Sequence, residues 1–302
     1  MKRRIGFSNS ITGADEQKLY MKSFKLATLQ KKGLDKVLEI YKENIETTSA
    51  IVKYCKNSGI KFYRLGTLFP FSTHKELENF DYIKYFDNDI YELGQLIKFS
   101  NTRISIHSSP YCILNSSNPE TAKRAANELK HHAKLMNVME LPANNRTVVH
   151  TGGMDGGKDK AKQRFVENFN RLPEEIKKRV VLENDDKVFS FKDVEDIHKQ
   201  TGVPVVIDIF HHRVFNPEGI KEVEALERAC KTWSEGEVPE IHFSCQEPEK
   251  AKGSHSATLN VEQFLSFLNP VAHLSFDVML EVKDTHQSVE KIIRELGDNA
   301  YR

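Results

Sequence analysis

The sequence predicts a single-domain α/β protein, a (β/α)8 (TIM) barrel that spans residues 1–302. Eight short β-like runs alternate with amphipathic stretches long enough to form helices, and this alternation favours parallel strands joined by right-handed crossovers. The chain of 302 residues also exceeds the ~250 that such a barrel typically needs. No proline- or serine-rich linker, internal repeat or low-complexity tract divides the sequence. We therefore expect one continuous domain.

The predicted strands are short runs rich in β-branched, aliphatic and aromatic residues, which strands favour. In chain order they cover residues 4–7, 61–65, 103–107, 147–150, 180–183, 205–208, 240–243 and 276–281. Each run ends where a longer, more polar stretch begins. Eight strand-helix units fit a closed barrel better than an open doubly wound sheet.

The predicted helices lie between these strands and carry apolar residues on one face. In chain order they cover residues 34–57, 81–99, 119–139, 158–172, 191–200, 217–234, 261–268 and 285–296. In the third, Ala122, Ala126, Leu129 and Ala133 recur at helical spacing, so one face can pack on a sheet. Residues 9–32 show no clear strand pattern, and we expect a long first loop with a short helical piece there.

The composition is that of an ordinary globular protein, with 39% hydrophobic and 29% charged residues. No apolar run approaches membrane-spanning length, and the basic first residues lead directly into a strand. The four cysteines are scattered without a closely spaced pair, which favours reduced thiols. We expect a monomeric, cytoplasmic protein with no membrane contact.

The charge balance does not by itself indicate a nucleic-acid partner. The chain has 44 basic and 43 acidic residues, a net charge of +1, whereas affinity for nucleic acid rests on phosphate neutralisation by lysine and arginine. Bound metal would neutralise several carboxylates, so such a partner stays open. Lys158 and Lys160, beside a glycine-rich turn at 152–157, are candidate phosphate contacts, although a solvated helix start accounts for them slightly better.

Acidic and histidine side chains lie at or just beyond the ends of most predicted strands. They are His107, His150, Glu183, Asp208, His211, His242 and Glu281. Because the carboxyl ends of barrel strands meet at one mouth, these residues can share a cluster of cations. Mixed imidazole and carboxylate ligands suit zinc, manganese or iron. Glu183 could bridge two ions, and the site predicts hydrolysis.

A series of motifs extends over almost the full length of the chain. They lie at 63–65, 68–70, 103–107, 111–116, 129–132, 149–153, 182–186, 208–212, 241–244 and 277–283, together with His74 and His255. In these motifs the chain resembles the UV damage endonuclease family, a branch of the barrel superfamily that also contains endonuclease IV and xylose isomerase. The run Leu-Glu-Asn-Asp-Asp around Glu183 is the most specific of them.

The resemblance implies an activity, a substrate and a set of site residues. The implied metal ligands are His107, His150, Glu183, Asp208, His211, His242, His255 and Glu281. It implies three divalent ions, with Mn²⁺ first and Zn²⁺ or Mg²⁺ as alternatives. The implied reaction cleaves double-stranded DNA immediately 5′ to a cyclobutane dimer or 6-4 photoproduct and leaves a 3′-hydroxyl and a 5′-phosphate. Beside Glu183, the expected catalytic residues are His74 and Lys283.

The sequence departs from the family pattern around the site. Glu240 stands where the family has a lysine that can be carbamylated, which makes Glu240 a candidate additional ligand with a shorter reach. Tyr111 is present to stack on bases, but Pro110 replaces its polar companion. Phe7 occupies a position often held by tyrosine. We expect Tyr111, Pro110 and Phe7 to line the lesion site, with an altered lesion range.

Two alternatives remain open at this point. One is another metal-dependent member of the superfamily, either an abasic-site endonuclease or a sugar isomerase. An isomerase mouth would be richer in carboxylates than this histidine-rich one. The other is a non-catalytic barrel that binds damaged DNA, which the intact acidic and histidine ligands disfavour.

Overall fold

Eight parallel strands close into a barrel in a computed structural model of the chain, with the strand order running from β1 to β8 without interruption. The structure describes all residues except 1–2, 13–17, 71, 73–75, 78–79 and 298–302. The strands are β1 (Ile5–Ser8), β2 (Phe62–Leu65), β3 (Arg103–His107), β4 (Arg146–His150), β5 (Val180–Glu183), β6 (Val205–Asp208), β7 (Glu240–Phe243) and β8 (Asp277–Leu280). All eight predicted strands are confirmed, as is the (β/α)8 barrel.

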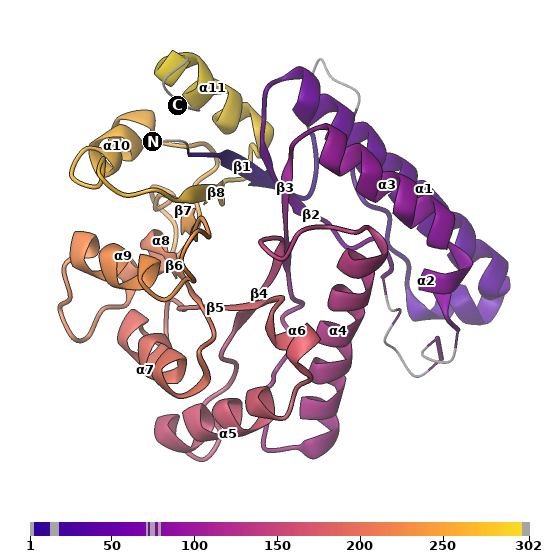
Figure 1. The fold of residues 1–302 in the computed structure, drawn as a ribbon, viewed down its shortest axis with the longest axis horizontal. Coiled ribbons are helices and arrows are strands. Elements are labelled where there is room, and N and C mark those ends of the chain that lie inside the picture. Colours follow the sequence, from indigo (N-terminus) through magenta and orange to yellow (C-terminus); the bar gives the residue numbers. More distant parts are fainter. Residues whose placement is uncertain (1–2, 13–17, 71, 73–75, 78–79, 298–302) are drawn as a thin grey trace.

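The helices surround the strands on the outside of the barrel (Figure 1). They are α1 (Leu26–Asn57), α2 (Tyr82–Tyr85), α3 (Asp87–Phe99), α4 (Pro119–Val138), α5 (Lys158–Asn170), α6 (Glu174–Lys177), α7 (Phe191–Thr201), α8 (Ile209–Val214), α9 (Glu222–Cys230), α10 (Val261–Leu268) and α11 (His286–Leu296). Across the described residues, none of these helices has the length and apolar character that crossing a membrane requires.

One predicted helix differs from the structure in its continuity, and another is preceded by the short helical piece that was expected. The predicted helix at 81–99 is two helices, because the backbone leaves helical geometry at Phe86, where φ is −106° and ψ is 23°. The first helix begins at Leu26 and breaks at Gly33, where φ is 73°. A left-handed φ is accessible to glycine without a side-chain clash. The turns before Gly33 form the short helical piece that was expected in the first loop.

The register of the strands places candidate ligands beside one another. His150 of β4 is aligned with Glu183 of β5, and Asp208 of β6 is aligned with His242 of β7. Because side chains alternate between the two faces of a strand, this register turns the aligned side chains to the same side of the sheet. The pairs therefore meet inside the mouth of the barrel.

The opposite end of the barrel interior is filled by a small apolar cluster and by buried ion pairs. Val148, Val181, Val206 and Trp233 form the apolar cluster. Arg103, at the start of β3, donates to Asp277 at the start of β8 over 2.7 Å. A buried arginine requires such partners because an unpaired buried charge is costly. This end of the barrel is therefore closed by packed and paired side chains.

Candidate metal centre

The carboxyl ends of six consecutive strands supply the side chains of one cluster. His107, His150, Glu183, Asp208 and His242 lie at or near the ends of β3 to β7, and Glu281 directly follows β8. His211 lies on the short helix α8, and His255 lies in the loop between β7 and α10. The structure brings together all eight residues that were predicted as ligands.

Glu183 is at the centre of this cluster. Its Oε2 lies 3.1 Å from His107 Nε2 and 3.4 Å from His150 Nε2. Its Oε1 lies 2.7 Å from His242 Nδ1 and 3.7 Å from His211 Nδ1. Burial would raise the pKa of Glu183, but the charges of His242 and His150 hold that pKa well below its ordinary value. The carboxylate is therefore ionised and faces four imidazoles.

Two groups of donor atoms meet at Glu183. One consists of His107, His150 and Glu183, and the other of Glu183, Asp208, His242 and Glu281. Within each group the donor atoms lie within 4.8 Å of one another. Imidazole nitrogen and carboxylate oxygen in such groups match the ligand preferences of zinc, manganese and related divalent ions. The shared carboxylate has the position that a bridging ligand requires.

Asp208 carries the clearest sign that the cluster suits a cation. Its Oδ1 accepts a hydrogen bond of 2.7 Å from the backbone N–H of His211. Its Oδ2 is buried and has no hydrogen-bond partner among the described residues. A buried carboxylate oxygen without a partner is costly, and a metal ion would satisfy it. The donor set therefore fits divalent metal ions.

Backbone carbonyls orient three of the histidines. The Nδ1 atoms of His107, His211 and His255 lie 2.9, 3.0 and 2.9 Å from the carbonyl oxygens of Ser108, Asn184 and Glu281. When Nδ1–H donates to a carbonyl, the lone pair of a neutral imidazole is on Nε2. Metal-binding histidines commonly have this arrangement. These three rings are therefore arranged to bind a cation through Nε2.

His211 and His255 extend the cluster on the side of the barrel mouth where α8 lies. Burial opposes protonation of His211, but the charges of Asp208 and Glu183 raise its pKa to about 9. The ring centres of His211 and His255 are 5.6 Å apart, and His255 Nδ1 lies 3.8 Å from Glu281 Oε2. His255 showed no periodicity of its own in the sequence. Its place beside Glu281 comes from the loop that crosses the mouth after β7.

Arg64, near the end of β2, is a buried cation that was not among the predicted site residues. Its Nη1 lies 2.5 Å from Glu281 Oε1, and its Nη2 lies 2.6 Å from His242 Nε2. Burial opposes ionisation of Glu281, but Arg64 and His242 hold the pKa of that carboxyl below its ordinary range. The signal in the sequence is an arginine between the apolar residues of a predicted strand, where a buried charge requires a partner.

Glu240, the candidate additional ligand, lies one layer deeper in the barrel than His242. It precedes His242 by two residues, so both side chains point to the barrel interior. Glu240 Oε1 accepts a hydrogen bond of 2.8 Å from Ser105 Oγ and lies 3.2 Å from His242 Nε2. Its Oε2 lies 3.8 Å from Arg103 Nη2. Glu240 therefore contacts the cluster from below and belongs to neither group of donor atoms.

Of the five residues predicted to contact DNA, three are exposed, one is half-buried and one is fully buried. Tyr111 is 82% exposed on the loop after β3, next to the exposed Pro110. Phe7 is fully buried and packs against Tyr63 and His286. Lys158 pairs with Asp193 over 2.8 Å, whereas Lys160 is exposed.

Of the two predicted catalytic residues outside the metal cluster, only Lys283 is among the described residues. Lys283 is exposed beyond β8. Its backbone N–H donates to the carbonyl oxygen of Ser256 over 3.2 Å, which ties the end of β8 to the loop that carries His255. His74 lies outside the described residues.

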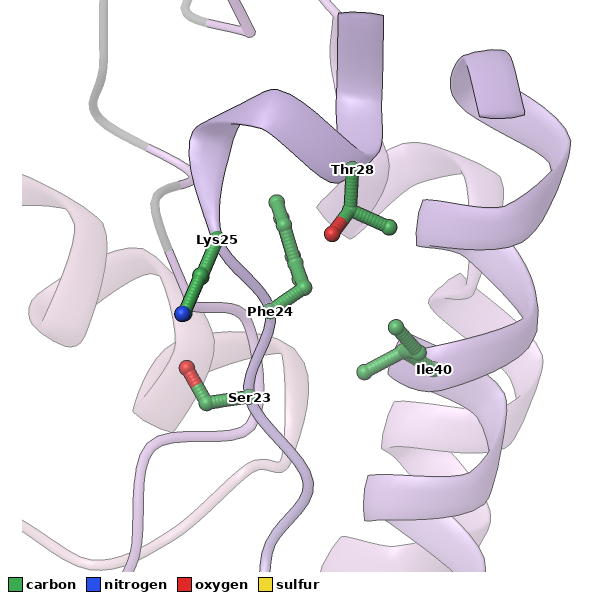
Figure 2. Close-up of a pocket in the computed structure, with 5 residues that line it drawn as sticks. All are labelled: Ser23, Phe24, Lys25, Thr28 and Ile40. Atoms are coloured by element: carbon green, nitrogen blue, oxygen red, sulfur yellow. The ribbon is translucent and has the colours of Figure 1, made fainter. Parts of the chain in front are cut away.

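A surface hollow lies between the segment that precedes α1 and the two parts of that helix. It is lined by Ser23, Phe24, Lys25, Thr28 and Ile40 (Figure 2). None of the predicted ligands or DNA-contacting residues lines it. The candidate metal centre and this hollow are therefore separate features.

The fold and the site together define an α/β barrel with candidate metal-binding clusters at its mouth. A family model described as UV-endonuclease UvdE matches residues 4–301. The chain belongs to this family, and it is an enzyme that cleaves DNA. The UV DNA damage endonuclease of Clostridium perfringens strain 13 is 31% identical over 281 residues, which cover 89% of this chain and 67% of that protein. That of Bacillus cereus strain G9842 is 33% identical over 283 residues, covering 91% and 87%.

Solved structures agree with this assignment. The crystal structure of SacUVDE superimposes with a TM-score of 0.90 at 32% identity and covers 99% of this chain and 100% of that one. A D-psicose 3-epimerase from Clostridium cellulolyticum H10 has a TM-score of 0.52 at 13% identity, covering 83% and 88%. This second likeness shows the barrel fold alone.

Proposed function

We propose that the protein hydrolyses the phosphodiester immediately 5′ to a UV photolesion in double-stranded DNA, leaving a 3′-hydroxyl and a 5′-phosphate. The lesions are cyclobutane dimers and 6-4 photoproducts, and the enzyme acts as a monomer. The observation that carries the proposal is the position of Glu183 between two groups of donor atoms. The names of the family and of its relatives supply the substrate class.

Three divalent ions would be held by the eight clustered residues, with Mn²⁺ preferred and Zn²⁺ or Mg²⁺ as alternatives. Such ions, when bound, lower the pKa of a coordinated water and offset negative charge on the phosphate. Glu183 would be shared by the two groups of ligands, and His107, His211 and His255 would contribute Nε2 donors. Arg64 holds Glu281 in place. His74 and Lys283 contact the scissile phosphate.

Lesion recognition depends on the loop after β3. A damaged duplex is easier to bend and unstack than an intact one, so a protein can select it without reading a base sequence. The exposed ring of Tyr111 stacks on a base at such a site, with Pro110 stiffening the tip of the loop. Lys160 contacts the phosphate backbone. Phe7 is fully buried against Tyr63 and His286, so it would shape the lesion site from within the barrel without touching DNA.

We expect Tyr111→Ala to reduce kcat/KM on a duplex with one thymine dimer by about tenfold or more, because stacking of one base on an aromatic ring contributes ~1–3 kcal/mol. Initial nicking rates below saturation measure the effect. Tyr111→Phe keeps the ring and should remain close to the wild type. Tyr91→Ala removes a tyrosine that is 45% exposed on α3 and serves as the matched control. Equal losses in the Tyr111 and Tyr91 variants would contradict the stacking role.

The substrate assignment is tested with supercoiled plasmid in the presence of Mn²⁺. UV-irradiated, abasic and undamaged plasmids are compared for conversion to the nicked circle, and end-labelled duplexes then locate the cut. We expect nicking of irradiated plasmid, cleavage 5′ to the lesion, and no turnover in excess chelator. Nicking confined to abasic plasmid would replace the assignment with an abasic-site endonuclease, and binding without nicking would indicate a non-catalytic barrel.

A further inference from the structure

The loop between β3 and α4 carries Tyr111 and is anchored at its far end by α5. Asn168 Nδ2 donates to the carbonyl oxygen of Leu114 over 2.8 Å, and Arg164 Nε donates to that of Asn115 over 2.7 Å. These bonds fix the part of the loop that follows Tyr111. They do not reach the part of the loop that precedes Tyr111.

Glu128 of α4 fixes the beginning of the same loop. Its Oε1 accepts a hydrogen bond of 2.6 Å from the backbone N–H of Ser109, and its Oε2 accepts one of 2.8 Å from Ser109 Oγ. Both oxygens of one carboxylate therefore bind one residue. Hydrogen bonds to a charged acceptor are stronger than neutral ones, and a two-point contact also fixes orientation.

Ser109 passes this constraint on to Tyr111. Its Oγ accepts a hydrogen bond of 3.3 Å from the backbone N–H of Tyr111, and its carbonyl oxygen accepts one of 2.9 Å from Cys112. The described residues meanwhile leave the side chain of Tyr111 largely open to solvent, since the residue is 82% exposed. The backbone of this loop is therefore what determines where the ring projects.

We infer that Glu128 is a positioning residue for lesion recognition, which holds the loop of Tyr111 in its DNA-contacting position through Ser109. The inference rests on the proposed function. A loop held in its binding conformation before DNA arrives loses less conformational entropy on binding. Ser108, whose carbonyl orients His107, has its own backbone bond of 2.9 Å to Val148. Loss of the Glu128 carboxylate would therefore leave the candidate metal ligands in place and would weaken binding of the damaged duplex.

The test compares Glu128→Ala, Glu128→Gln and Ser109→Ala on a duplex with a single thymine dimer. We expect Glu128→Ala to raise KM roughly tenfold, with kcat within about twofold of the wild type. The loop is then mobile before DNA arrives, and its conformational freedom is lost on binding. Ser109→Ala removes the hydroxyl's bonds to Glu128 and to the Tyr111 N–H but keeps the bond from the Ser109 N–H to Glu128, so its effect should be intermediate. Glu128→Gln keeps an oxygen that accepts the Ser109 N–H, so it should recover most of the affinity.

Glu120→Ala on the same helix is the matched control, since Glu120 is an exposed acid in the first turn of α4. Amide hydrogen exchange of residues 109–116 in the absence of DNA should accelerate in Glu128→Ala and not in Glu120→Ala. The inference is overturned if exchange and KM are unchanged, or if kcat falls as much as the affinity. A wild-type enzyme that fails to nick the dimer duplex would instead overturn the proposed function.

Discussion

Replacement of Glu183 by alanine is expected to abolish nicking of UV-irradiated DNA and to leave the barrel folded. Glu183 is the one residue common to both groups of donor atoms, and four imidazoles face its two oxygens. Its loss would remove a donor from both groups at once. We expect a reduction in rate on the order of 10³-fold or more, as for loss of a principal electrostatic contact in an active site.

Single-turnover nicking and calorimetric titration with Mn²⁺ measure this effect together. The titration should show weaker binding and fewer ions bound, and circular dichroism should show an unchanged helical content. Glu235→Ala is a suitable control, because Glu235 is exposed in the turn before β7. Turnover that survives in Glu183→Ala would exclude the metal mechanism.

Replacement of Arg64 by methionine is expected to destabilise the metal-free protein far more than the metal-loaded one. Arg64 contacts both Glu281 and His242 and is only 6% exposed. Removing one partner of a buried ion pair leaves the other charge without compensation and typically costs about 3–5 kcal/mol. Bound Mn²⁺ would supply positive charge to Glu281 and recover part of that loss.

Urea unfolding of chelator-treated protein, with and without added Mn²⁺, separates these contributions. The midpoint should fall strongly in Arg64→Met without metal and much less with it. Arg64→Lys keeps the charge but cannot form two divergent contacts, so it should be intermediate. Arg294→Met, at an exposed position on α11, controls for general effects of the substitution. An equal loss in both conditions would show that Arg64 has a packing role unrelated to the metal centre.

The strands and most ligands were predictable from the sequence for one physical reason. Short β-branched runs define where strands end, and the carboxyl ends of barrel strands converge, so an ordered series of strand-end ligands implies one cluster. His107, His150, Glu183, Asp208 and His242 follow from this rule. His255 does not follow from it, because it lies on a loop, and only the resemblance to the family pointed to it.

The features that could not be predicted depend on partners distant in the sequence. Arg64 is separated from Glu281 by 217 residues, and nothing local indicates that the two side chains meet. Glu128 looks like one more polar residue of an amphipathic helix until its contact with Ser109 is known. The break of the predicted helix at 81–99 follows no proline or glycine signal at Phe86. In each case the local sequence pattern does not carry the information that decides the structure.

The alignment of His150 with Glu183, and of Asp208 with His242, has a consequence for how the enzyme matures. Ligands come from strands spread between β3 and β8, and the long-range pairing of β1 with β8 closes the ring. Such non-local pairings form slowly, because chain entropy is lost before the contacts are gained. A chain emerging from the ribosome therefore holds only scattered, low-affinity donors. A metal ion that needs the whole cluster would therefore bind with high affinity only after the strands that carry the candidate ligands have paired.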